Sequence, residues 1–256
     1  MKVRAGGFKS VSKKRWRLAQ GYEQAFQERK AENLRGSERE FVASKMVQAQ
    51  KLRELLSPFV NFSVSSRILE VGSGPHGISF FFAEGSRYSL DPLAVFYHRA
   101  FKEIQSGSGS KIVRAQGESI PFLSTCFDLV ITSNVLDHTM APKQVLGEIH
   151  RVLRQDGILY LGVNVCLLRG CMLSRIHELL VAPWLVLNAF GPHPFCFQAN
   201  DILKLLREQG FRILETASVP YQTETDPGKS FLQNSKQKLI QWFVGAQYLK
   251  IICLKS

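Results

Sequence analysis

Three glycines, Gly72, Gly74 and Gly77, follow a short apolar stretch at residues 67–71. Glycine allows a sharp turn and lets a ligand approach the backbone at the carboxyl end of a strand. The string G-x-G-x-x-G fits a dinucleotide site. Asp91, which lies 19 residues after Gly72, fits an acid that binds ribose hydroxyls. The spacing therefore predicts a nucleotide-containing ligand at this turn.

Glu70 narrows the choice of ligand. It lies near the end of the apolar stretch, two residues before Gly72. A carboxylate beside the turn favours a ligand with an ammonium and a sulfonium over one with two phosphates, because opposite charges attract and like charges repel.

The elements that must position these residues alternate in type along the chain. Strand-like apolar runs and helical patterns succeed one another between residues 67 and about 219, which is typical of a doubly wound, mostly parallel sheet with helices on both faces. The predicted strands are 67–71, 88–90, 111–114, 127–132, 158–163, 211–219 and 248–254, and the predicted helices are 16–33, 38–56, 94–104, 143–154, 202–209 and 231–244.

Charge and composition suggest a division of the chain. Lys and Arg number 33 against 21 Asp and Glu, and the first 60 residues alone carry 14 basic and 6 acidic side chains. We therefore expect a basic arm with N-terminal helices at 1–60 and an α/β domain at 61–256, with an apolar cap insertion at 167–197. A basic arm can bind nucleic acid or anionic lipid, or stay solvated.

Hydropathy along the chain predicts neither a membrane-spanning helix nor a signal peptide. No stretch of about 18 uncharged apolar residues exists, and Met1–Arg17 lacks the apolar segment of a signal peptide. The five cysteines show no CxxC pairing. We expect a cytoplasmic protein with reduced thiols.

Five segments resemble, in the correct order, the motifs of class I S-adenosylmethionine-dependent methyltransferases of the methyltransferase 11 type. They are Glu-Val-Gly-Ser-Gly-Pro-x-Gly at 70–77, Ser-Leu-Asp-Pro at 89–92, and the segments 116–122, 127–138 and 148–157. The resemblance implies a seven-stranded Rossmann-like fold, S-adenosylmethionine as cofactor and methyl transfer as activity.

The resemblance also implies a set of cofactor-binding residues. The methionine end would lie at the first turn and beyond the fourth strand, the ribose on Asp91, and the adenine beside 116–122. Gln116 departs from the family pattern, which usually has Asp or Asn there. The full set is Glu70, Gly72, Ser73, Gly74, Asp91, Pro92, Gln116, Gly117, Ser133 and Asn134.

The residues after the fourth predicted strand bear on the acceptor. Ser133-Asn-Val-Leu136 lacks the Pro-Pro-aromatic sequence of enzymes that methylate nucleobase amines, and no cysteine stands where C5 methylation would need one. A small organic acceptor is therefore the leading prediction, and the apolar run Leu179–Phe190 suggests a hydrophobic one. His138 is the first candidate for a general base and His193 the second. We assign no metal, because the other four histidines lack a carboxylate or cysteine at ligand spacing.

Several alternatives stay open. The basic arm would suit a structured-RNA methyltransferase, and the departure at Gln116 would suit a non-enzymatic S-adenosylmethionine-binding protein. A dinucleotide oxidoreductase is a more distant alternative. The arm and the apolar insertion together would suit peripheral contact with an anionic membrane. The sequence leaves the oligomeric state open.

Overall fold

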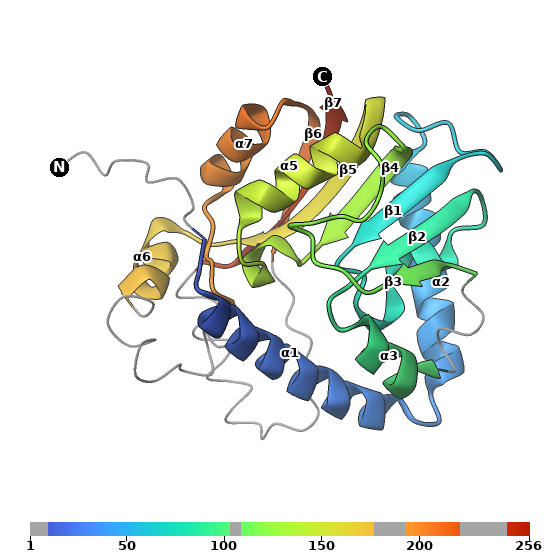
Figure 1. Cartoon of the computed structure of the whole chain (residues 1–256), viewed down its shortest axis with the longest axis horizontal. Helices are drawn as coiled ribbons and strands as arrows, with labels where there is room; N and C mark the ends of the chain where they lie inside the picture. Colours follow the sequence, from blue (N-terminus) through green and yellow to red (C-terminus); the bar gives the residue numbers. More distant parts are fainter. Residues whose placement is uncertain (1–9, 103–108, 177–192, 221–244) are drawn as a thin grey trace.

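The computed structural model describes residues 10–102, 109–176, 193–220 and 245–256. Its centre is a seven-stranded sheet in the order β3-β2-β1-β4-β5-β7-β6 (Figure 1). Neighbouring strands are parallel except β7, which runs antiparallel to both β5 and β6. The strands are β1 Arg67–Val71, β2 Ser86–Leu90, β3 Lys111–Val113, β4 Phe127–Ser133, β5 Leu153–Val165, β6 Phe211–Pro220 and β7 Gln247–Lys255. The predicted fold class is confirmed.

Helices cover both faces of the sheet. The longer ones are α1 Lys13–Leu34, α2 Glu38–Leu56, α3 Ala94–Ala100, α5 Pro142–Val152, α6 Leu168–Ile176 and α7 Ala199–Glu208. Figure 1 shows α5 and α7 on one face and α2 on the other. Three single-turn 3-10 helices, η1 Gly74–His76, η2 Ile78–Phe81 and η3 Leu136–His138, lie in the loops.

Strand β4 shows why the sheet needs two helical layers. Its side chains alternate between faces, as in any strand. Val130 is buried in the cluster that includes α5 and α7, whereas its neighbours Leu129 and Ile131 are buried in the cluster that includes α2. A strand that is apolar on both sides is stable only when both sides are covered.

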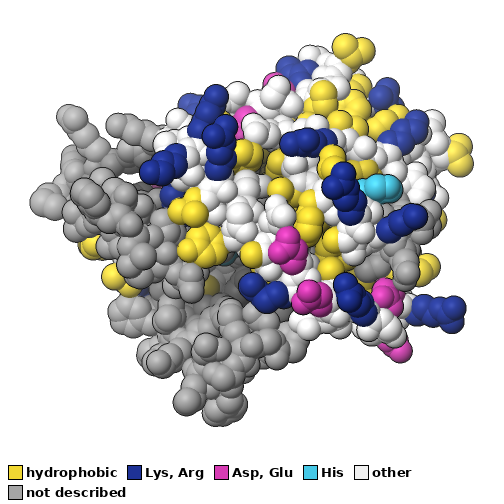
Figure 2. Space-filling model, turned by 60° about the horizontal axis from the view of Figure 1, so that its bottom comes forward, with side chains coloured by type: hydrophobic (Ala, Val, Ile, Leu, Met, Phe, Trp, Pro, Cys, Tyr) yellow, Lys and Arg dark blue, Asp and Glu magenta, His cyan; other side chains and the backbone are white. Residues whose placement is uncertain are grey.

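Helix α1 runs across the carboxyl ends of the parallel strands (Figure 1). It begins where the Ser12 side chain accepts a hydrogen bond from the Arg15 N–H at 3.2 Å. The Val11 N–H, just before it, donates to the Met140 carbonyl at 3.0 Å. Figure 2 shows the molecule with this side turned forward, and Lys and Arg side chains are scattered over it among apolar and acidic ones.

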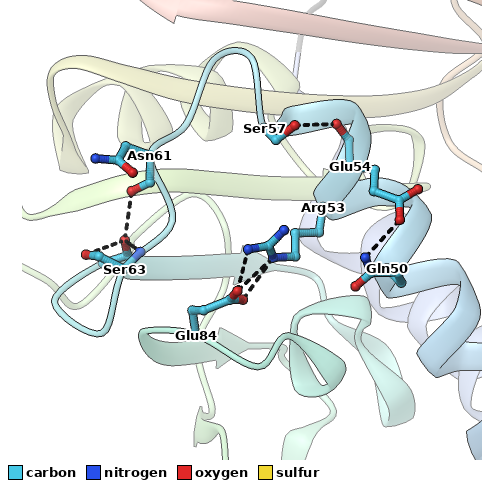
Figure 3. Close-up of polar contacts among 8 residues, drawn as sticks. Gln50, Arg53, Glu54, Ser57, Asn61, Ser63 and Glu84 are labelled. Atoms are coloured by element: carbon cyan, nitrogen blue, oxygen red, sulfur yellow. Dashed lines mark hydrogen bonds and ion pairs between the residues drawn. The ribbon is translucent and has the colours of Figure 1, made fainter.

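The C-terminal part of helix α2 is attached near the opposite, amino ends of β1 and β2. Arg53 donates from Nε to both carboxylate oxygens of Glu84, at 2.9 and 3.0 Å (Figure 3). The same guanidinium lies 5.3 Å from the centre of the Phe62 ring. Since Phe62 precedes β1 and Glu84 precedes β2, this contact leaves the carboxyl ends of the strands free for a site.

Some predicted boundaries differ from the observed ones. Strand β5 begins at Leu153, five residues before its predicted start, because Leu153 already pairs with Phe127 of β4. Asp156 then takes a left-handed conformation (φ 59°), and pairing with β4 resumes at Ile158 after a shift in register. The predicted helix 231–244 and the apolar run Leu179–Phe190 lie outside the described residues. Within those described, no helix has the length and apolarity needed to cross a membrane.

The turn after β1 gives a first test of this structure. Gly72 has φ +69°, and an added Cβ would lie 2.4 Å from a methyl carbon of Val135, whereas Gly74 has φ +60° and open space around it. Gly72→Ala should lower the free energy of unfolding by about 2–4 kcal/mol, combining the left-handed backbone with overpacking. Gly74→Ala should lose only the backbone part, about 1–2 kcal/mol. Equal losses in urea unfolding would show that Val135 does not constrain the turn.

Candidate functional site

Asp91 connects the two turns that follow β1 and β2. Its carboxylate accepts hydrogen bonds from the N–H of Gly74 at 3.0 Å and the N–H of Leu93 at 2.8 Å. The residue is only 7% exposed, and burial raises the pKa of Asp91 to about 6 although both hydrogen bonds favour the charged form. At neutral pH an ionised carboxylate therefore lies between the turns.

An open cleft of about 620 Å³, open solvent included, lies beside Asp91. Helix α1 supplies one wall through Trp16, Gln20 and Glu23. The carboxyl ends of the strands and their loops supply the other, through Val71, Gly72, Gly74, Leu90, Asp91, Pro92, Tyr97, Gln116, Gly117, Glu118, Asn134, Val135, His138 and Thr139. Seven of the ten predicted cofactor residues are among these lining residues.

The other three predicted cofactor residues bond to the chain itself and are not in the lining of this cleft. Glu70 accepts from the N–H groups of Ile78 at 3.0 Å and Ser79 at 2.8 Å. Burial raises the pKa of Glu70 in spite of these bonds. The Ser73 hydroxyl is 3.3 Å from the Gly74 carbonyl, and that of Ser133 bonds to the Tyr248 hydroxyl. In this structure Glu70 holds the glycine-rich turn in place.

Another carboxylate fixes the loop segment 116–122, which was predicted to lie against adenine. Glu118 accepts from the N–H of Met140 at 2.6 Å and that of Ala141 at 3.0 Å, at the start of α5. From the end of α5, Arg151 donates to the carbonyls of Ile120 and Phe122, both at 2.8 Å. The two ends of α5 therefore hold the segment 116–122, which forms part of the cleft wall.

A buried acid and two histidines meet beyond the carboxyl end of β4. Asp137 is 3% exposed, and its Oδ2 lies 2.9 Å from Nδ1 of His193 and 3.9 Å from Nε2 of His138. The two imidazole rings are 4.5 Å apart between centres. Asp137 Oδ1 is buried without a hydrogen-bond partner among the described residues. One carboxylate thus orients His193 and lies close to His138.

The electrostatics of this group follow from burial and charge. Burial alone would raise the pKa of Asp137, but the charges of His138 and His193 and the hydrogen bond from His193 lower it to about 2. Burial alone would lower the pKa of His193, but the hydrogen bond and the charge of Asp137 raise it above its usual value. Asp137 therefore stays ionised across the ordinary pH range.

Spacing along the chain does not predict that these three residues meet, because Asp137 and His193 are 56 residues apart. It indicates His138 and His193 only as separate candidate bases. The fold joins them, and the Phe195 N–H also donates to the Asp137 carbonyl at 3.4 Å. Ligand atoms of all three lie within 4.8 Å of one another, so the group could also hold a divalent cation, which spacing along the chain did not indicate.

The cleft residues on α1 were also missed in part. Gln20 and Glu23, which line the cleft, are not among the residues that the sequence singles out. Helical spacing identifies a helix and its apolar face, yet it does not say which ligand site the helix covers.

Comparisons with known proteins agree with this geometry. The profile of the methyltransferase domain family matches residues 69–161. An uncharacterized methyltransferase of Mycobacterium avium (strain 104) is 34% identical over 102 residues, 39% of this chain and 40% of that protein. One of Mycobacterium marinum (strain ATCC BAA-535 / M) is 37% identical over 108 residues, 41% and 42% of the two chains. The chain thus aligns with less than half the length of these curated relatives.

Solved structures share the fold at low sequence identity. The geranyl diphosphate C-methyltransferase of Streptomyces coelicolor A3(2), solved with Mg²⁺, geranyl diphosphate and S-adenosyl-L-homocysteine, has a TM-score of 0.62 at 11% identity, covering 81% of this chain and 79% of that one. The YcgJ protein of Bacillus subtilis has a TM-score of 0.59 at 14% identity, covering 79% and 97%. Residues 69–161 thus match a methyltransferase domain family, and the fold, with its cleft at the carboxyl ends of β1 and β2, is the one that these solved structures share.

Proposed function

We propose that this protein transfers a methyl group from S-adenosylmethionine to a small organic acceptor. The observation that carries the proposal is that one cleft is lined by the glycine-rich turn, by Asp91 and by His138, which belongs to the Asp137–His193 group. A cofactor site and a proton-accepting group are then adjacent.

The charges of the cleft suit this cofactor. Its described lining includes the acids Glu23, Asp91 and Glu118 and no lysine or arginine. Such a lining attracts an ammonium and a sulfonium and repels a pyrophosphate, which supports S-adenosylmethionine over a dinucleotide. Asp91 would accept hydrogen bonds from the ribose hydroxyls, and Gly72 and Gly74 would let the ligand approach the backbone closely.

His193 is the residue that we assign as general base. When bound, S-adenosylmethionine supplies a methyl group whose leaving group is a neutral thioether, so alignment accounts for much of the rate. With Nδ1–H of His193 donating to Asp137, Nε2 is the atom that accepts a proton from the acceptor. His138 lines the cleft beside it and would position the acceptor.

The acceptor that we propose is apolar at least in part. Trp16 and Val135, both partly exposed, contribute apolar side chains to the cleft. The structural neighbour that carries geranyl diphosphate shows only that this fold accommodates an apolar acceptor in another protein.

We also propose that the chain divides near residue 60. The N-terminal helices would form one wall of the cleft, and a methyltransferase domain at 61–256 would include a cap at 167–197.

Helix α6 favours an acceptor at a lipid surface as a second candidate. Leu168, Met172, Leu173 and Ile176 are between 41% and 56% exposed, and Arg169 is exposed beside them. Exposed apolar side chains with a neighbouring cation are typical of helices that lie in a membrane interface. On the face shown in Figure 2 the described basic side chains are dispersed among others, and residues 1–9 of the basic arm, on which the structured-RNA alternative depends, lie outside the described residues.

Asp91 gives the most direct test of cofactor binding. Asp91→Ala should weaken S-adenosylmethionine binding by roughly 2–4 kcal/mol, because two hydroxyls lose a charged acceptor. In the wild-type protein, affinity should fall as the pH drops below about 6, where Asp91 becomes protonated. Isothermal titration measures both the affinity and its pH dependence.

Asp128→Ala is a matched control, because the Asp128 carboxylate also accepts a hydrogen bond from a backbone N–H, that of Arg67, but at the amino ends of the strands. Equal affinity of Asp91→Ala and the wild type would make Asp91 a turn residue only.

The base assignment predicts a change in rate and in its pH dependence. His193→Ala should lower kcat by about 10²–10⁴-fold with little change in cofactor affinity. For the wild type, kcat/KM for the acceptor should rise with pH through an apparent pKa above 6.5, because His193 must be neutral to accept a proton and Asp137 raises its pKa. Asp137→Asn should move that inflection to lower pH.

Two outcomes would contradict this assignment. Loss of activity in His138→Ala with full activity in His193→Ala would reverse the roles of the histidines. Loss of wild-type activity with a chelator, restored by a divalent cation, would make Asp137, His138 and His193 a metal site instead.

Vesicle sedimentation tests the lipid-surface candidate. The protein should pellet with anionic vesicles more than with neutral ones, and Met172→Glu should reduce the bound fraction several-fold, because it puts a charge on the apolar surface. Lys51→Gln on α2 lowers the net charge by the same amount as Met172→Glu and is the control for net charge. Equal and negligible pelleting with both vesicle types would leave a soluble acceptor.

A further inference from the structure

Three of the five cysteines converge at one corner of the fold. Cys166 follows β5, Cys171 lies in α6, and Cys196 lies in the segment that leads into α7. The Sγ atoms of Cys171 and Cys196 are 3.3 Å apart, and Cys171 Sγ is 3.9 Å from the Cys166 carbonyl. Cys171 is buried at 2% exposure, whereas Cys166 and Cys196 are half-buried. Solvent therefore reaches part of the group.

This cluster is attached to the segment that carries His193. The Cys166 N–H donates to the Phe197 carbonyl at 2.8 Å, and Val165 and Phe197 form a parallel bridge. Cys196 stands three residues after His193, and between them the Phe195 N–H donates to the Asp137 carbonyl. A covalent change at Cys196 would act on the backbone that positions His193 on Asp137.

We propose that Cys171 and Cys196 are a site of reversible thiol–disulfide modification by small disulfides such as oxidised glutathione. The separation of 3.3 Å must shorten by only about 1.3 Å to reach the covalent S–S length of about 2.05 Å. The proposal goes beyond methyl transfer and does not require it.

Cys166 is the entry point for the small disulfide. A hydrogen bond from the Cys196 thiol lowers the pKa of Cys166 against the effect of burial, and the same bond raises the pKa of Cys196. Cys166 is therefore the thiolate of the pair and attacks first, and Cys196 attacks after passing its proton to the small thiolate that is released. Cys166 attacks the small disulfide and releases one small thiolate. Cys196 then attacks the sulfur of Cys166 in the mixed disulfide and releases the second, and Cys171 attacks the sulfur of Cys196 and releases Cys166 as a thiolate.

The electrons and protons balance in this sequence. Two protein thiols are oxidised to one disulfide, and the small disulfide is reduced to two thiols, which take up the two protons that Cys196 and Cys171 lose. No other oxidant is needed.

The experiment compares the full-length reduced protein before and after incubation with oxidised glutathione. Free thiols are counted in guanidinium, and the alkylated protein is digested with trypsin for mass spectrometry. The count should fall from five to about three. Trypsin cuts after Arg169, which separates Cys166 from Cys171, so the linked peptides identify the partner of Cys196. We expect a Cys171–Cys196 linkage.

Variants distinguish the roles of the thiols. Cys196→Ser should prevent any internal disulfide, and Cys166→Ser should slow formation several-fold without changing the final linkage. Cys253→Ser, in β7, should behave as the wild type. An unchanged thiol count, a stable Cys166–Cys196 bond, or normal thiol loss in Cys196→Ser would overturn the proposal. Because the assay involves no methyl transfer, its outcome is independent of the proposed function.

Discussion

The cleft depends on the bonds between the buried carboxylate of Asp91 and two backbone N–H groups. Removing a carboxylate from water is unfavourable, and burial accordingly raises the pKa of Asp91 to about 6. The N–H groups of Gly74 and Leu93 offset part of it and bring the turns after β1 and β2 together. A ligand that donates to Asp91 would complete this arrangement, since a carboxylate accepts more hydrogen bonds than these two.

The same kind of bond recurs around the cleft. Glu70 holds the start of η2, Glu118 holds the start of α5, and Glu148 accepts from the Ile120 N–H at 2.9 Å. Each is an acid in one of the five motif segments. Of these three, only Glu118 also lines the cleft. In this structure the acids of these motif segments therefore hold loops in place around the cleft.

Most of the fold could be predicted from the sequence because central strands such as β4 are apolar on both faces and the glycine-rich turn needs left-handed backbone at Gly72 and Gly74. Much of the cleft lining could be predicted too, since residues after parallel strands meet at one edge of the sheet. The Asp137–His193 pair could not be predicted from the sequence, because it depends on how the chain after β5 returns to η3. The cysteine cluster could not be predicted either, because its members are spaced irregularly and meet only through α6 and the bridge at Phe197.

A crystal structure with S-adenosylhomocysteine would test the central claim most directly. We expect the ribose hydroxyls within hydrogen-bond distance of Asp91, the adenine beside Gln116 and Gly117, and the thioether sulfur facing His138 and the Asp137–His193 pair. The ligand bound elsewhere, or in this cleft with its ribose away from Asp91, would contradict the account.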